Sequence, residues 1–553
     1  MKNKTLWIIL IIVLIAVVFF AAFFLKGGIF PWITEEEVTP YVPPIGEVLP
    51  TATFFSPSAV TPTLEPDMVW VDPGLPEPLL DQLAGMDFLQ ITDQQEDAAT
   101  SLFIGDDNPI TYWVFAAAAP FPTITDGISL EGIKSAWQGG KNPLAPNNPI
   151  FLSQETRDIL AIYWGEPSSN AVEIITSDNL SKQAWTHQPS LAILPFDELT
   201  PDWKVLEIDG ISPLEQVFDP GSYGLSLAIS AVGFDPNIFQ EITSNRDPNK
   251  FTSVVLTGVT ALVRATAWTM EKEGINYPAR DILQYLIEAD ILHISNEVPF
   301  AQGCPYPNPV QEGLRFCSDS RYIELMETIG TDVVELTGDH FGDQGPEAML
   351  YTLEMYNQRD WPYYGGGADR TDAQEPVLFD HNGNKIAFLG CNAKGGGYAT
   401  ANVGYPGAVA CDFPKMTGQI KELRDEGYLP IATFQHFEYY TYLAQPDQIR
   451  DARTLTNAGA VIVSGSQAHQ PQAFEIRDEA FIHHGLGNLF FDQIYEIPPH
   501  TASAFIDRHI FYNGKHISTE LLTIKFEDFA RARPMTQSER ERLLQTTFSA
   551  SNW

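Results

Sequence analysis

Residues 332–360 read DVVELTGDHFGDQGPEAMLYTLEMYNQRD, and they carry the clearest strand–loop–helix pattern of the chain. The apolar run at residues 332–338 ends in glycine, which is typical of a buried strand, and the apolar positions of residues 346–360 recur at helical spacing. In layered α/β folds, functional side chains gather in the loops that follow the carboxyl ends of strands. Asp339 and His340 occupy such a loop, so we expect them at a functional edge of an α/β sheet.

Five other apolar segments around this stretch predict further strands, at residues 253–258, 291–295, 385–390, 430–434 and 460–465. Amphipathic segments such as residues 446–459 lie between several of them, which indicates a layered α/β domain over about residues 249–530. Polar residues again follow the predicted strands, namely Glu297, His436, Glu438, Gln467 and His469.

These residue types favour a metal site. Carboxylate, imidazole and amide groups that converge from several loops bind divalent cations, and two such ions can activate a hydroxide for phosphoester cleavage. Each residue taken alone also fits a structural role. Asp339 or Glu297 at a strand end can cap the next helix, and His340 or His469 can be a hydrogen-bonded core imidazole.

The ordered series of motifs resembles the capsule-synthesis (CapA, poly-γ-glutamate) family over roughly residues 250–500. That family carries an Asn-Asn-His-x-x-Asp-x-Gly motif, a helix and a Tyr-x-Gly-x-Gly turn. In residues 337–377, His340, Asp343 and Gly345 keep this spacing, and SNE at residues 295–297 resembles the family's Asn-Leu-Glu segment. AGAVIVSGSQAHQPQAFEI and FIHHGLGNLFFD resemble its Gly-His-His-Pro-His loop and its Ser-Leu-Gly-Asn-Phe close. The matching residues there are His469, Gly487, Asn488 and Asp492.

The resemblance implies a calcineurin-like metallophosphatase fold, in which a layered β-sandwich is flanked by helices and carries a metal site at one edge. It also implies a divalent cofactor such as Mn, Fe or Zn, cell-surface anchoring, and association with a capsular polymer and with capsule-synthesis membrane proteins. The residues it assigns to catalysis are His340, Asp343 and His469. The residues it assigns to metal binding are Glu297, Asp339, His340, His436 and His469.

Three departures from the family pattern bear on catalysis. The family's opening aspartate, which can be a metal ligand, is replaced by Val259, and the first histidine of the His-Pro-His pair corresponds to Gln467. In TFQHFEYY, residues 433–440, either His436 or Glu438 aligns with the family's His-Trp-Gly-x-Glu segment, but not both. We therefore expect a site that holds one metal ion at most.

Two functions from different classes stay open. The first is a CapA-like protein that acts in the synthesis, anchoring or handling of a surface polymer such as poly-γ-glutamate, with metal-dependent hydrolase activity as an option. The second is a non-catalytic surface binding protein that keeps the fold and has lost the dinuclear metal site. The retained His340, Asp343 and His469 favour the first function, whereas Val259 and Gln467 favour the second.

The N-terminal residues predict a membrane anchor. The apolar run Leu6–Leu25 spans about 30 Å as a helix, the thickness of a bilayer's hydrocarbon core. Lysines precede it and glutamates follow it, so the positive-inside rule places the N-terminus in the cytoplasm and the rest of the chain outside. A cleaved signal peptide would have a shorter apolar region and a small-residue cleavage site. We predict a cytoplasmic stub and transmembrane helix at residues 1–27 and a Pro-rich linker at residues 28–66.

The remaining segments are a smaller α/β domain at residues 67–245 and a C-terminal tail at residues 531–553. The smaller domain resembles one lobe of periplasmic-type solute-binding proteins, which implies ligand binding or docking. The formal net charge of −39 repels phosphate backbones, so we do not expect nucleic acid as a partner.

The four cysteines lie between residues 304 and 411 and form no CxxC pair, which argues against a zinc ribbon or a redox motif. Outside the membrane an even number of cysteines favours disulfides. We expect sequential pairing, Cys304 with Cys317 and Cys391 with Cys411, although the sequence leaves the other two connectivities open.

Overall fold

The computed structural model describes residues 67–553 apart from residues 88, 234–238, 240–241, 396, 398–399 and 494–498. The predicted anchor at residues 1–27 and the predicted linker at residues 28–66 lie outside the described residues. Among the helices that are described, none combines the length and the apolar character needed to cross a bilayer.

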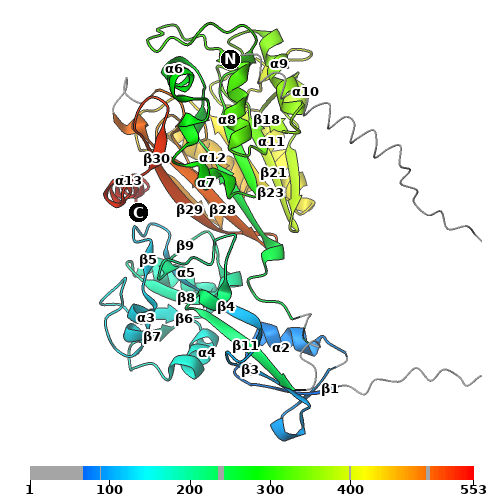
Figure 1. The fold of residues 1–553 in the computed structure, drawn as a ribbon, viewed down its shortest axis with the longest axis vertical. Coiled ribbons are helices and arrows are strands. Elements are labelled where there is room, and N and C mark those ends of the chain that lie inside the picture. The colour runs from blue at the N-terminus through cyan, green and yellow to red at the C-terminus, as the bar shows by residue number, and fades with distance from the viewer. Residues whose placement is uncertain are drawn as a thin grey trace, which may run out of the picture. The chain divides into compact units, whose positions relative to one another are not determined.

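The N-terminal domain is built on a mixed sheet with the strand order β2-β1-β3-β11-β4-β8-β6-β7, and β9 pairs with β4 (Figure 1). The strands are β1 (Asp67–Val71), β2 (Leu89–Thr92), β3 (Thr100–Ile104), β4 (Pro109–Pro120), β6 (Ile150–Leu152), β7 (Val172–Ile174), β8 (Leu191–Pro195), β9 (Trp203–Val205) and β11 (Ser226–Gly233). The helices are α2 (Glu77–Ala84), α3 (Leu130–Trp137), α4 (Gln154–Trp164) and α5 (Ser177–Thr186). The longest strand, β4, is buried from Trp113 to Pro120 and forms the centre of this domain's core.

The C-terminal domain contains two large sheets. The first has the order β18-β17-β14-β12-β28-β29-β30, and its parallel part is β12, β14, β17 and β18. Its strands are β12 (Phe251–Leu256), β13 (Val259–Thr260), β14 (Ile291–Asn296), β17 (Val333–Glu335), β18 (Tyr363–Tyr364), β27 (Asn488–Phe490), β28 (Ser503–Tyr512), β29 (Lys515–Phe526) and β30 (Ala532–Pro534).

The second sheet has the order β20-β21-β23-β24-β26-β25, with β21, β23, β24 and β26 parallel. Its strands are β20 (Val377–His381), β21 (Asn384–Asn392), β23 (Leu429–Gln435), β24 (Ile462–Ser464), β25 (Phe474–Arg477) and β26 (Ala480–His483). All six strands that the sequence predicts for this domain are present, as β12, β14, β17, β21, β23 and β24. Their apolar runs are continuous because parallel strands between two layers are buried on both faces.

Helices cover the outer faces of the two sheets, which confirms the expected layered α/β architecture. The first sheet packs against α6 (Arg264–Glu273), α7 (Leu283–Ile287), α8 (Ile323–Thr328) and α9 (Pro346–Asn357). The second packs against α11 (Phe413–Asp425) and α12 (Pro446–Ala458), and the short α10 (Arg370–Ala373) lies before β20. Between the sheets, residues such as Val254, Leu256 and Phe505 meet Phe388, Ile431 and Phe474.

Both expected disulfides are present. Cys304 is bonded to Cys317, and Cys391 is bonded to Cys411, so the sequential pairing is confirmed. The first bridge closes a proline-rich loop, and within this loop the backbone N–H of Phe316 donates a hydrogen bond to Asp343. The second closes the loop that follows β21, and backbone hydrogen bonds between Asn392 and both Val409 and Cys411 lie beside it.

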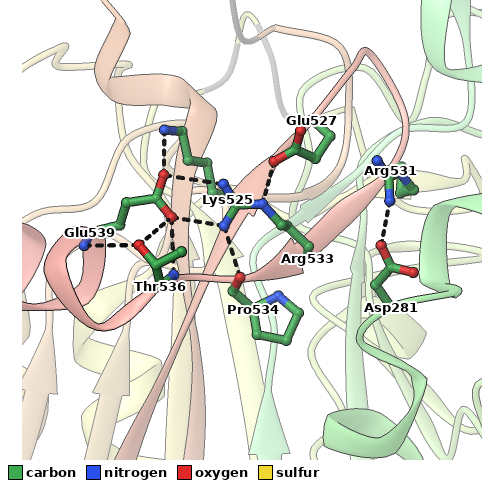
Figure 2. A network of polar contacts seen from close by, with 8 residues as sticks. All are labelled: Asp281, Lys525, Glu527, Arg531, Arg533, Pro534, Thr536 and Glu539. Carbon is green, nitrogen blue, oxygen red and sulfur yellow. Dashed lines mark hydrogen bonds and ion pairs between the residues drawn. The ribbon is translucent and has the colours of Figure 1, made fainter.

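Residues 531–553, which the sequence suggested as a tail, form β30 and α13 (Gln537–Ala550). Leu543, Leu544 and Phe548 of α13 are buried in the core between the sheets. Figure 2 shows how the start of the helix is held, because the carboxylate of Glu539 accepts hydrogen bonds from Lys525 at 2.8 Å and from Arg533 at 2.7 Å. This segment is therefore an integral part of the C-terminal domain.

Candidate metal site

Three of the predicted ligands converge at the carboxyl ends of neighbouring parallel strands. Glu297 follows β14 directly, and Asp339 and His340 lie in the loop after β17, the strand that pairs with β14. One ligand atom from each of these three residues lies within 4.8 Å of the other two. The arrangement matches the expectation from the strand–loop pattern, and it brings two carboxylates and one imidazole together.

Glu297 is the most deeply buried member of this cluster, with a relative exposure of 1%. Its Oε1 atom has no hydrogen-bond partner among the described residues. Burial raises the pKa of the Glu297 carboxyl, although the neighbouring His469 and His340 act in the opposite direction. A buried carboxylate oxygen without a partner is costly, and a cation held with Asp339 and His340 would satisfy it. The residues therefore fit a single divalent ion.

His340 is oriented by Asp343. The Nδ1 atom of His340 lies 2.8 Å from Oδ2 of Asp343, and the same oxygen accepts a hydrogen bond from the backbone N–H of Phe316 at 2.7 Å. This leaves Nε2 as the nitrogen that can bind a metal, an arrangement common among metal-ligating histidines. Burial favours the neutral ring, but the Asp343 hydrogen bond and the charges of Glu297 and Asp339 raise the pKa of His340 to about 9.

Asp339 is held on both sides. Its Oδ1 accepts a hydrogen bond from Gln435 Nε2 at 2.9 Å, and its Oδ2 accepts one from Lys394 Nζ at 2.7 Å. Burial opposes ionisation of the carboxyl, but the charge and hydrogen bond of Lys394 outweigh it, so the pKa of Asp339 is lowered. Asp339 is therefore ionised at neutral pH and available to a cation.

His469 lies close to this cluster. Its Nδ1 is 2.8 Å from Oδ1 of Asn488, and its ring packs against Phe491 with centroids 5.2 Å apart. His469 is one of the groups that oppose the burial-driven rise in the pKa of Glu297. His469 is thus a neighbour of the three-residue cluster, with its Nδ1 engaged and its Nε2 left for a ligand.

His436 does not join the cluster. Its Nδ1 lies 3.7 Å from Asp447 and its Nε2 lies 3.4 Å from Asp451, and both carboxylates belong to α12. Glu438, two residues later, takes the place in the site, because its Oε1 contacts the Lys394 ammonium at 2.5 Å. Glu438 and Asp339 therefore contact the same ammonium, whereas His436 contacts two carboxylates of α12.

Two of the three departures from the family pattern, Val259 and Gln467, have structural rather than ligand contacts in the described residues. Val259 is fully buried in an apolar cluster with Ala261, Val298, Phe316 and Phe491, so no carboxylate reaches the site from β13. Gln467 donates a hydrogen bond from Nε2 to Ser295 Oγ at 2.6 Å, and its Oε1 has no partner in the described part of the chain.

Sequence reasoning missed three polar residues that complete the site: Asn392, Lys394 and Gln435. Asn392 donates to the backbone oxygen of Thr337 and to Gln435 Oε1, both at 2.9 Å, and thereby ties β21 to the loop after β17. All three follow the carboxyl ends of predicted strands at residues 385–390 and 430–434, which was the signal that the sequence offered. A lone lysine in a glycine-rich loop gives no reason to expect a buried ion pair.

The C-terminal domain matches known proteins. Residues 253–493 match the family model described as bacterial capsule synthesis protein PGA_cap, which confirms the resemblance drawn from the motifs. The capsule biosynthesis protein CapA of Bacillus anthracis is 23% identical over 278 residues, which is 49% of this chain and 67% of that protein. The PGA biosynthesis protein CapA of Bacillus subtilis (strain 168) is 25% identical over 194 residues, covering 35% of this chain and half of the relative. Among solved structures, the 5'-nucleotidase precursor of Thermus thermophilus aligns over 55% of this chain and 58% of its own, with a TM-score of 0.31 at 11% identity.

Proposed function

We propose that this chain, whose residues 253–493 match the PGA_cap family, is a membrane-anchored capsule protein that handles a surface polymer such as poly-γ-glutamate outside the cell. We further propose that it has a metallophosphatase-type fold and binds one divalent ion, Mn, Fe or Zn, through Glu297, Asp339 and His340. The observation that carries the metal proposal is the convergence of these three groups within 4.8 Å around a buried, unpartnered oxygen of Glu297.

The residues of the site have distinct roles in this proposal. Glu297 and Asp339 supply negative charge, and Asp343 holds His340 with Nε2 toward the ligand. In this proposal His469, whose Nδ1 lies 2.8 Å from Asn488 Oδ1, contacts a polymer group bound at the site. A divalent ion bound here would supply Lewis acidity toward a carbonyl or phosphoryl oxygen of the polymer.

Metal analysis of the purified full-length chain tests the proposal. We expect one divalent ion per chain, and we expect Glu297→Gln to lose most of it because the buried carboxylate is a ligand. Glu422→Gln is a matched control, because Glu422 lies exposed on α11. Equal metal content in both variants, or no metal in the wild type after loading with Mn²⁺ or Zn²⁺, would contradict the metal proposal.

A non-catalytic binding protein is the second candidate function. The apolar burial of Val259 and the Gln467–Ser295 hydrogen bond favour it, because both occupy positions where the family resemblance implies metal ligands. Binding of poly-γ-glutamate that is saturable and unchanged by a chelator would favour this candidate. Binding that disappears with the chelator and in Glu297→Gln would favour the metal-dependent candidate.

The proposed anchoring and orientation have their own test. Protease added to intact protoplasts is expected to remove both folded domains and leave a membrane-bound fragment of the N-terminal residues. Protection of the C-terminal domain from protease, with cleavage only after lysis, would show that this domain lies in the cytoplasm.

A further inference from the structure

Lys394 places a buried positive charge between two carboxylates at the edge of the site. Its Nζ donates to Asp339 Oδ2 at 2.7 Å and to Glu438 Oε1 at 2.5 Å. The side chain of Lys394 is only 5% exposed, and those of Asp339 and Glu438 are 7% and 30% exposed. An ammonium that is removed from water in this way is held by its two anionic partners.

The two carboxylates come from separate loops and both contact this ammonium. Asp339 follows β17 in the first sheet, whereas Glu438 follows β23 in the second sheet. Carboxylates that converge from different loops on one point are the usual arrangement around a divalent cation. Here the point of convergence is filled by a lysine side chain.

Asp339 links this ion pair to the metal cluster described above. It contributes a ligand atom to the group formed with Glu297 and His340, and it also accepts the Lys394 hydrogen bond. A carboxylate shared between two cations is the usual feature of a two-metal centre. The chain thus keeps the shared carboxylate, but one of the two cation positions belongs to a covalently attached ammonium.

The loop that carries Lys394 is constrained. The Cys391–Cys411 disulfide closes it, and the backbone N–H of Lys394 donates to Asn392 Oδ1 at 2.9 Å. Asn392 is itself fully buried and bonded to Gln435, the residue that positions the other oxygen of Asp339.

We propose that the ammonium of Lys394 is a built-in cation that takes the place of a second divalent ion between Asp339 and Glu438. The site is thereby built for one exchangeable ion and one fixed charge. This inference rests on the proposed single-metal function for the first ion only. A second divalent ion would need further anionic ligands, and the buried, apolar Val259 supplies none.

The test is the number of Mn²⁺ ions bound by the full-length chain at neutral pH, measured by equilibrium dialysis and elemental analysis. We expect one ion in the wild type and two in Lys394→Ala, because the variant leaves two converging carboxylates and an open space. Lys385→Ala is the matched control. Lys385 is an exposed lysine of β21, so this variant should bind one ion like the wild type. Lys394→Gln is measured in parallel. Glutamine is larger than alanine and fills more of the space that the lysine leaves, so this variant controls for a folding defect in Lys394→Ala.

A second measurement follows the same variants by thermal unfolding. Mn²⁺ is expected to raise the unfolding temperature of Lys394→Ala more than that of the wild type, since it replaces the lost charge. Equal stoichiometry in the wild type and in both Lys394 variants would overturn the inference, as would two ions in the wild type. No ion in the wild type but one in Lys394→Ala would refute the proposed single-metal function and still support the built-in cation.

Discussion

Metal binding by this site should depend steeply on pH, because His340 must release a proton before it can bind an ion. In the metal-free protein the imidazole is hydrogen-bonded to Asp343 and faces Glu297 and Asp339, and the pKa of His340 is raised to about 9. Below that pH the ring carries a proton on both nitrogens, and the proton on Nε2 competes with the metal. Affinity for Mn²⁺ is therefore expected to rise with pH up to about 9.

The size of the effect follows from the pKa of His340. Competition by one proton weakens the apparent affinity about tenfold for each pH unit below the pKa, which is about 1.4 kcal/mol per unit. With a pKa of about 9, half of the imidazole is already deprotonated at pH 9, so the apparent dissociation constant at pH 7 should be roughly 50-fold larger than at pH 9. That ratio corresponds to about 2.3 kcal/mol of binding free energy.

The electron paramagnetic resonance signal of free Mn²⁺ measures this affinity directly. Asp343→Asn removes the carboxylate that raises the pKa, so the pH-dependent range should move to lower pH. Its affinity near pH 9 should also fall by about 10–100-fold because the ring is no longer held. Asp412→Asn is the matched control, since Asp412 caps α11 and asparagine caps helices equally well. An affinity of the wild type that is the same at pH 7 and pH 9 would refute the reasoning.

Three further results are expected. Phe548→Ala should lower the free energy of unfolding by about 3–5 kcal/mol, because this ring is 5% exposed and packs in the core between the sheets. A urea titration measures the change, and Gln545→Ala at an exposed position of the same helix is the control. Burial lowers the pKa of His516 to about 3 and lowers that of His509 well below its ordinary value. Above about pH 6.5 both rings are neutral in the folded and the unfolded chain, so neither reduces the free energy of unfolding there. As the pH falls from about 6.5 toward 3, these histidines take up protons in the unfolded chain but not in the folded protein. The free energy of unfolding should therefore fall by about 1.4 kcal/mol per pH unit for each ring. A free energy of unfolding that does not change with pH, in the wild type and in His516→Gln alike, would contradict this. Reduction of the two disulfides should cost about 2–4 kcal/mol each, measured as a lower unfolding temperature, and alkylation before reduction should find no free thiol.

Much of the C-terminal domain could be predicted from the sequence because its parallel strands are buried on both faces. Such strands are continuous apolar runs, and each of the six predicted runs became a strand. The carboxyl ends of parallel strands meet at one edge, so the positions of Glu297, Asp339 and His340 after β14 and β17 were enough to predict their convergence. The disulfides followed similarly, since each joins the two ends of one short loop.

The sequence alone determined the strands of the C-terminal domain, the strand-end location of the carboxylates and the absence of a carboxylate at Val259. Only the tertiary structure decided that Glu438 rather than His436 turns toward Asp339, because side-chain direction in an irregular loop has no sequence period. It also decided the role of Lys394, which pairs with residues 55 and 44 positions away in the chain. Such pairs depend on which strands become neighbours in the sheets and on how the sheets stack. Neither the order of the strands nor the stacking of the sheets can be predicted from the residues next to Lys394 in the sequence.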